Sequence, residues 1–107
     1  MSIPLVDQVQ QNLLFQQLWT QVTPIKLSNI TILQGFPKEK LISDDETNLN
    51  KEFVLPIKLK DEITPNMLDQ VFKELQGVKR LVLGIVNDDG TVVYYIVHDG
   101  VYKPKKN

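Results

Sequence analysis

Apolar and polar positions form their clearest pattern near the C-terminus, where two apolar runs flank a polar turn. Residues 81–86 are apolar apart from Gly84, and the run is too short for a helix, so it predicts a strand covered on both faces. Residues 91–97 are mostly β-branched or aromatic, which predicts a second strand. Between them, Asp89-Gly90 favours a hairpin turn, because both residues tolerate positive φ.

The second strand of this hairpin has no charged face and almost no polar one. Alternation places Thr91, Val93, Tyr95 and Val97 on one side and Val92, Tyr94 and Ile96 on the other. Such a strand either lies inside a sheet covered on both faces, or presents a face and an edge to a partner chain. The pattern therefore favours a role in assembly over self-contained catalysis.

Helical spacing of apolar residues predicts an amphipathic helix over residues 2–18, with Ser2 as a cap and Pro4 in the first turn. At its end, Phe15 and Trp19 lie four residues apart and widen the apolar surface. We expect this surface to pack on the protein's own sheet, and a helix that binds a partner is the alternative.

A second helix is predicted to begin at Thr64-Pro65, with Thr64 as the N-cap, and to end at Gly77. Gly84, in the strand that follows, is expected to let a helix approach the sheet closely. The apolar stripe of the second helix consists of Leu68, Val71, Phe72 and Leu75.

The remaining apolar runs predict further strands. Residues 19–33 suggest one or two short strands, of which 30–34 is the surer, and residues 52–59 suggest another. Pro56 lacks an N–H donor, which predicts an edge position or an irregularity there. The polar residues 37–51 are expected to form a solvated, mobile loop. The order of elements predicts one domain over residues 1–107, of the α+β (mixed α/β) class, with helices packed on a mixed sheet.

Composition narrows the chemistry. The chain of 107 residues has a formal net charge of −1 and no cysteine, which excludes disulfides, thiolate metal sites and a cysteine nucleophile. We expect no cofactor and no membrane insertion, and a soluble intracellular protein. The only histidine is His98, and its neighbour Asp99 is expected on the opposite face of the strand, so the two form no catalytic pair.

Two basic clusters are candidates for contact with a nucleic-acid backbone. They are the pair before the first hairpin strand and the C-terminal tail. Solvated ends of a strand and of the chain are the alternative interpretation. The candidate residues are Lys79, Arg80, Lys103 and Lys105.

Residues 78–95, VKRLVLGIVNDDGTVVYY, resemble the C-terminal nuclease-like domain of the tRNA-splicing endonuclease family. The shared pattern is a helix, a basic pair, an apolar strand, an acidic turn with glycine, and a strand with two tyrosines. With a small fungal subunit of that enzyme, the similarity extends to residues 12–19, 53–57 and 100–105 and is weakest at 38–51. The resemblance implies the fold of the tRNA-intron endonuclease C-terminal domain.

The family implies a four-subunit enzyme that excises introns from precursor tRNA, with two catalytic and two structural subunits. Catalysis in the family uses a Tyr, a His and a Lys, the first two placed before the last helix. Lys79 falls where the family has its Lys, but no Tyr precedes Tyr94 and no His precedes His98. The resemblance therefore implies a structural subunit that is not itself an enzyme.

In the family the last strand pairs two subunits, and the acidic loop before it docks on the opposite pair. The resemblance thus implies partners among the catalytic and structural subunits, and contact with precursor tRNA through the complex. The apolar strand itself predicts that the isolated chain forms homodimers. The resemblance also implies a location in the nucleus, or in the cytoplasm at the mitochondrial surface. The pairing strand would contain Val92, Val93, Tyr94, Tyr95, Ile96 and Val97, and the docking loop Asp88, Asp89 and Gly90.

Two other functions remain open from the residues alone. A homodimeric adaptor without any RNA function fits the apolar hairpin equally well. A free-standing ribonuclease would need its own acid–base pair, which the sequence does not display.

Overall fold

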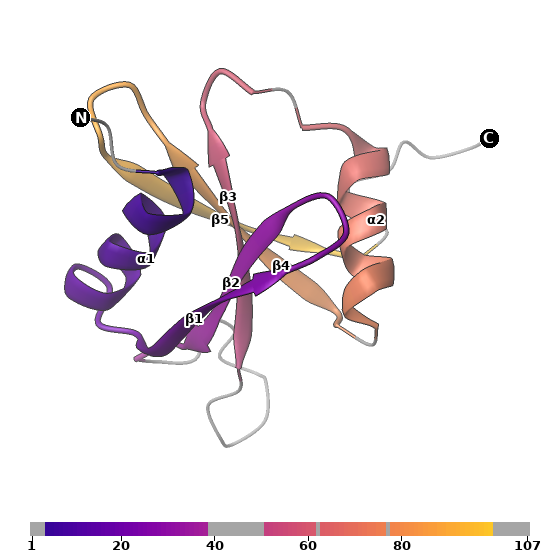
Figure 1. Ribbon diagram of the computed structural model, residues 1–107, viewed down its shortest axis with the longest axis horizontal. Helices are drawn as coiled ribbons and strands as arrows, with labels where there is room; N and C mark the ends of the chain where they lie inside the picture. Colours follow the sequence, from indigo (N-terminus) through magenta and orange to yellow (C-terminus); the bar gives the residue numbers. More distant parts are fainter. Residues whose placement is uncertain (1–3, 39–50, 62, 77, 100–107) are drawn as a thin grey trace.

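A computed structural model describes residues 4–38, 51–61, 63–76 and 78–99. It contains a five-stranded mixed sheet with two helices, α1 and α2, on opposite sides (Figure 1). The predicted α+β class is confirmed. In chain order the elements are α1 (Leu5–Phe15), β1 (Thr20–Lys26), β2 (Thr31–Phe36), β3 (Glu52–Lys58), α2 (Pro65–Leu75), β4 (Arg80–Val86) and β5 (Val92–His98).

The strands follow the chain across the sheet, in the order β1-β2-β3-β4-β5. Only the β3–β4 pair is parallel, because α2 carries the chain from the end of one strand to the start of the other. The other neighbouring pairs are antiparallel. This order leaves β1 and β5 as the two edges of the sheet.

The core forms two apolar clusters, one on each face of the sheet. Residues Val9 and Leu13 of α1 are fully buried against one face. Leu68, Val71 and Phe72 of α2 pack on the other. Alternate residues of each central strand supply the two clusters, so β4 is covered on both sides, as its apolar run predicts.

Gly84 lies where α1 comes close to the sheet. A Cβ at this position would lie 3.0 Å from Val9 Cγ1, 3.2 Å from Val54 Cγ1 and 3.3 Å from Tyr94 Cε1. These distances are tighter than ordinary packing contacts. The expectation that this glycine permits close approach of a helix is confirmed.

Helix α2 begins as predicted. The Thr64 side chain accepts a hydrogen bond from the backbone N–H of Met67 at 3.2 Å, and Pro65 occupies the first turn. The helix ends at Leu75, followed by Gln76 with a φ of 45°. The predicted stop at Gly77 lies outside the described residues.

Helix α1 is shorter than the predicted 2–18. It ends at Phe15, and Leu18 adopts a φ of 61°, which turns the chain so that the backbone N–H of Trp19 bonds to the carbonyl of Leu13 at 2.8 Å. Trp19 is buried against the sheet from this turn rather than from the helix. The predicted cap Ser2 lies outside the described residues.

Of the two alternatives predicted for Pro56, the edge position is wrong because β3 is the central strand, whereas an interruption of the pairing near the proline is present. The pairs between β3 and β2 end at Val54, while the pairs between β3 and β4 include Pro56 with Gly84. The proline therefore lies past the end of the β2 ladder, where a missing N–H interrupts no pairing with that strand. Of the predicted polar loop, residues 39–50 lie outside the described residues.

Candidate subunit interface

Strand β5 forms one edge of the sheet. It pairs with β4 over seven residue pairs, from Arg80 opposite His98 to Val86 opposite Val92. On its other side, no strand from the described part of the chain follows it. An uncovered strand edge presents backbone donors and acceptors to which another strand can bond. This edge coincides with the predicted pairing strand.

The two faces of β5 are only partly covered. On the α1 side, Val92 and Tyr94 pack against the core, while Ile96 stays 37% exposed. On the α2 side, Val93 and Tyr95 are 40% and 57% exposed. Because the helices cover the centre of the sheet, an apolar strand is left exposed at its rim.

Tyr94 and Tyr95 differ in their environment although they are neighbours in the sequence. The Tyr94 hydroxyl donates to Asn12 Oδ1 of α1 at 2.7 Å, and partial burial raises the pKa of Tyr94 far above its ordinary value. Tyr94 therefore stays protonated and ties β5 to α1. Tyr95 faces the opposite side, where its side chain is more than half exposed.

The turn between β4 and β5 is held by hydrogen bonds of its own. The backbone N–H of Asn87 bonds to the carbonyl of Thr91 at 2.8 Å, and that of Gly90 to the carbonyl of Asn87 at 3.0 Å. Gly90 has a φ of 92°, whereas Asp89 is not among the described residues with positive φ. The loop thus uses the glycine alone for the left-handed position, as three-residue hairpin loops do.

The two carboxylates of this turn have different surroundings. Asp89 Oδ1 accepts hydrogen bonds from the backbone N–H of Thr91 at 3.0 Å and from its Oγ1 at 2.7 Å. These bonds lower the pKa of Asp89. Asp88 is exposed, with one carboxylate oxygen 4.0 Å from the Nζ of Lys60, which is exposed as well. Asp89 therefore shapes the turn, and Asp88 projects from it.

The predicted basic residues do not form one surface. Lys79 is exposed before β4, but the Arg80 side chain is turned inward and forms a bidentate ion pair with Glu52. Contact of Arg80 with RNA stays a prediction, and this ion pair counts against it. Lys103 and Lys105 lie outside the described residues.

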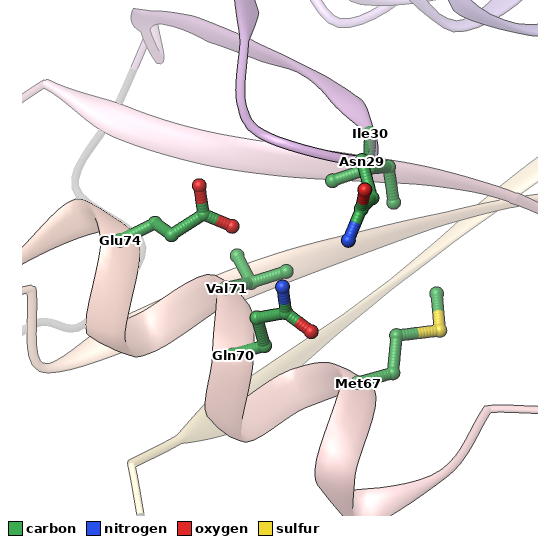
Figure 2. A pocket seen from close by; sticks show the side chains of 6 residues that line it. All are labelled: Asn29, Ile30, Met67, Gln70, Val71 and Glu74. Atoms are coloured by element: carbon green, nitrogen blue, oxygen red, sulfur yellow. The ribbon is translucent and has the colours of Figure 1, made fainter.

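A second surface feature lies between α2 and the loop that joins β1 to β2, as Figure 2 shows. It is an open groove of about 280 Å³ whose walls include Ile30, Met67 and Val71. At one end, Glu74 Oε1 accepts hydrogen bonds from the backbone N–H of Ser28 at 2.9 Å and from its Oγ at 2.6 Å, which lower the pKa of Glu74. No local sequence pattern predicts this groove, because its two walls come from distant parts of the sequence. Ser28 and Glu74, which are in contact, are separated by 46 positions along the chain.

Within the described ranges, no group of three or more His, Asp or Glu side chains is placed to hold a metal ion. His98 is exposed at the end of β5. No described helix is both long and apolar enough to cross a membrane. What the geometry offers is a surface for strand pairing.

Comparison with known proteins identifies the family of this chain. The family model for the Sen15 protein matches residues 8–107. The chain belongs to the Sen15 family.

Two Sen15 relatives show how far the similarity extends. The tRNA-splicing endonuclease subunit SEN15 of Eremothecium gossypii is 42% identical over 104 residues, which cover 92% of this chain and 87% of that protein. The probable tRNA-splicing endonuclease subunit sen15 of Schizosaccharomyces pombe is 31% identical over 91 residues, which cover 71% of this chain and 60% of that protein. The family resemblance read from the C-terminal residues is thus confirmed.

Proposed function

We propose that this chain is a non-catalytic subunit of the heterotetrameric tRNA-splicing endonuclease, which excises introns from precursor tRNA. The observation that carries the proposal is the match to the Sen15 family over residues 8–107. The sequence supports a non-catalytic role, because no Tyr precedes Tyr94 and no His precedes His98. General acid–base catalysis at the family positions would need such groups.

Pairing with a catalytic subunit takes place through β5, and a Sen34-like subunit is the partner we propose. The geometry supports this because β5 has an uncovered edge with Val93, Tyr95 and Ile96 exposed around it. A strand added along this edge continues the sheet and covers these side chains. In isolation, the same edge pairs with a second copy about a two-fold axis.

The acidic turn docks on the opposite pair of subunits. Asp88 supplies the docking carboxylate, since its side chain is exposed at the turn. Asp89 acts indirectly, because its Oδ1 holds Thr91 and thereby the shape of the turn. Gly90 completes the turn with its positive φ.

The complex, rather than this chain alone, binds precursor tRNA. Among the candidate basic residues that the structure describes, Lys79 is the one whose side chain is exposed and can reach a phosphate backbone. The chain resides where the complex does, in the nucleus or on the cytoplasmic surface of mitochondria. Imaging a fluorescently tagged copy beside a tagged catalytic subunit tests this. Separate locations for the two proteins would contradict it.

The experiment that tests the proposal is affinity purification of the tagged chain from its own cells. We expect the larger nuclease subunits to copurify with the wild type and with Asn66→Asp, a charge on an exposed position of α2. We expect Tyr95→Asp to lose the catalytic subunit, because a charge at the pairing edge would have to be desolvated. Recovery of nothing but a second copy of the chain would instead indicate the homodimeric adaptor.

A further inference from the structure

A pocket opens beside the uncovered edge of β5, on the face of the sheet that α1 covers. Its volume is about 140 Å³, which suits a single side chain. Its lining carries no charge, so it suits an apolar group and disfavours an ionised one. The lining residues are Leu13, Gln17, Trp19, Val82, Tyr94 and Ile96.

Two exposed apolar side chains belong to the elements that line this pocket, one on β5 and one at the end of α1. Ile96 is 37% exposed on its wall, and Phe15 at the end of α1 is 72% exposed. The hydrogen bond from Tyr94 to Asn12 marks where α1 meets β5. Phe15 follows Asn12 by three residues and is therefore its neighbour on the helix surface. Phe15 thus lies on the flank of α1 that faces the β5 side.

Strand pairing would place a partner's side chain at this position. A strand added to β5 runs about 4.8 Å from it, and side chains directly opposite have Cβ atoms about 4.5–5.5 Å apart. On the α1 face, the side chains opposite Tyr94 and Ile96 come to the mouth of the pocket.

We propose that this pocket receives one large apolar side chain from the pairing strand of the catalytic subunit, and that Phe15 packs over it. The inference rests on the proposed function, because it requires a strand along β5. It assigns to the end of α1 a role in recognising the partner. The Phe15 side chain, which packing within the chain leaves exposed, would then be covered by the partner subunit.

The test measures the affinity of the full chain for a purified Sen34-type catalytic subunit of the same organism. Gln17→Trp fills the pocket from an exposed position, and Gln17→Ala is its matched control. We expect the first to weaken binding at least about tenfold and the second to leave it within about twofold. Phe15→Gln should weaken binding about tenfold, while Phe15→Leu retains most of it.

The outcomes separate this inference from the proposed function. The proposed role of the pocket is refuted if Gln17→Trp and Phe15→Gln both bind as tightly as the wild type. Circular dichroism and unfolding curves must show that both variants are folded. If Tyr95→Asp abolishes binding in that same series, strand pairing stands and the pocket alone is refuted. If the wild type does not bind the catalytic subunit at all, the inference and the proposed function fall together.

Discussion

The ion pair between Glu52 and Arg80 allows the sharpest test of how this fold is held together. It joins the first residues of the parallel strands β3 and β4, with side chains 5% and 16% exposed. Arg80 Nε donates to Glu52 Oε1 at 3.2 Å, and Arg80 Nη2 pairs with Glu52 Oε2. One guanidinium thus occupies both oxygens of the carboxylate, the strongest geometry for such a pair.

Removing one partner leaves a charge in a place with little access to water. The cost of breaking a buried pair in this way is about 3–5 kcal/mol of unfolding free energy. We expect Glu52→Leu to cost about 3 kcal/mol, the lower end, because Arg80 keeps some contact with solvent. Arg80→Met leaves the more deeply buried carboxylate, and we expect a cost of about 4 kcal/mol. The double variant removes both charges and should lie within about 1 kcal/mol of wild type.

Urea unfolding of the purified chain, followed by circular dichroism, measures these differences. A domain of this size has a total stability of roughly 5–15 kcal/mol, so losses of this size shift the midpoint visibly. Lys79→Met is the matched control, since Lys79 is exposed, and should change stability by less than about 0.5 kcal/mol. If the losses of the two single variants instead add up in the double variant, the energetic coupling between Glu52 and Arg80 is refuted.

Three further predictions concern β4, β5 and their turn. Gly84→Ala should lower the free energy of unfolding by about 1–3 kcal/mol, measured by thermal or urea unfolding, because the new Cβ would lie 3.0 Å from Val9 Cγ1. An unchanged stability would mean that α1 can shift away from the sheet. The lowered pKa of Asp89 stabilises the fold above its ordinary pKa of 3.8, and this contribution is lost as the pH falls through the lower folded value. The stability gap between wild type and Asp89→Asn should therefore narrow below pH 3.8, and a constant gap would contradict the turn hydrogen bonds. Asp88→Ala should leave folding and pairing intact but weaken assembly of the four-subunit complex by roughly 2–5 kcal/mol. If the variant forms tetramers at the same protein concentrations as the wild type, Asp88 has no part in docking.

Local signals in the sequence predict much of this fold. Thr64-Pro65 marks the start of α2 because a cap and a first-turn proline need only neighbouring residues. Gly90 marks the hairpin because the left-handed position is a local requirement. Where tertiary contacts decide, the same approach fails. Trp19 continues the apolar spacing of α1, yet the turn at Leu18 removes it from the helix.

Pairing across the sheet explains the other differences. Pro56 suggests an edge strand, but whether its missing N–H matters depends on where the β2 ladder ends, which no local pattern reveals. Glu52 is the first residue of the predicted strand 52–59 and directly follows the polar stretch, and β4 brings Arg80 against it from 28 residues away. A carboxylate is buried only when such a partner arrives, so its burial could not be predicted from its neighbours.

The candidate interface was predictable in outline and not in detail. Alternation separates Tyr94 from Tyr95, but only the position of α1 decides that Tyr94 is the one tied to the fold. The apolar side chains of β5 are exposed because the strand lies at the sheet edge. The sequence allowed this position but also allowed a strand covered on both faces. The sequence left open whether Phe15 packs on the sheet or binds a partner, and only the structure shows that its side chain stays 72% exposed.

We infer that this chain serves the endonuclease by holding the complex together and not by catalysing cleavage. The most direct measurement is cleavage of precursor tRNA by the purified chain alone, by the four subunits together, and by the other three without it. We expect the four-subunit complex to cleave precursor tRNA and the chain alone not to cleave it. When this chain is omitted, we expect both the assembled complex and the cleavage to be lost. Cleavage by the chain alone, or equal cleavage by the other three subunits, would contradict it.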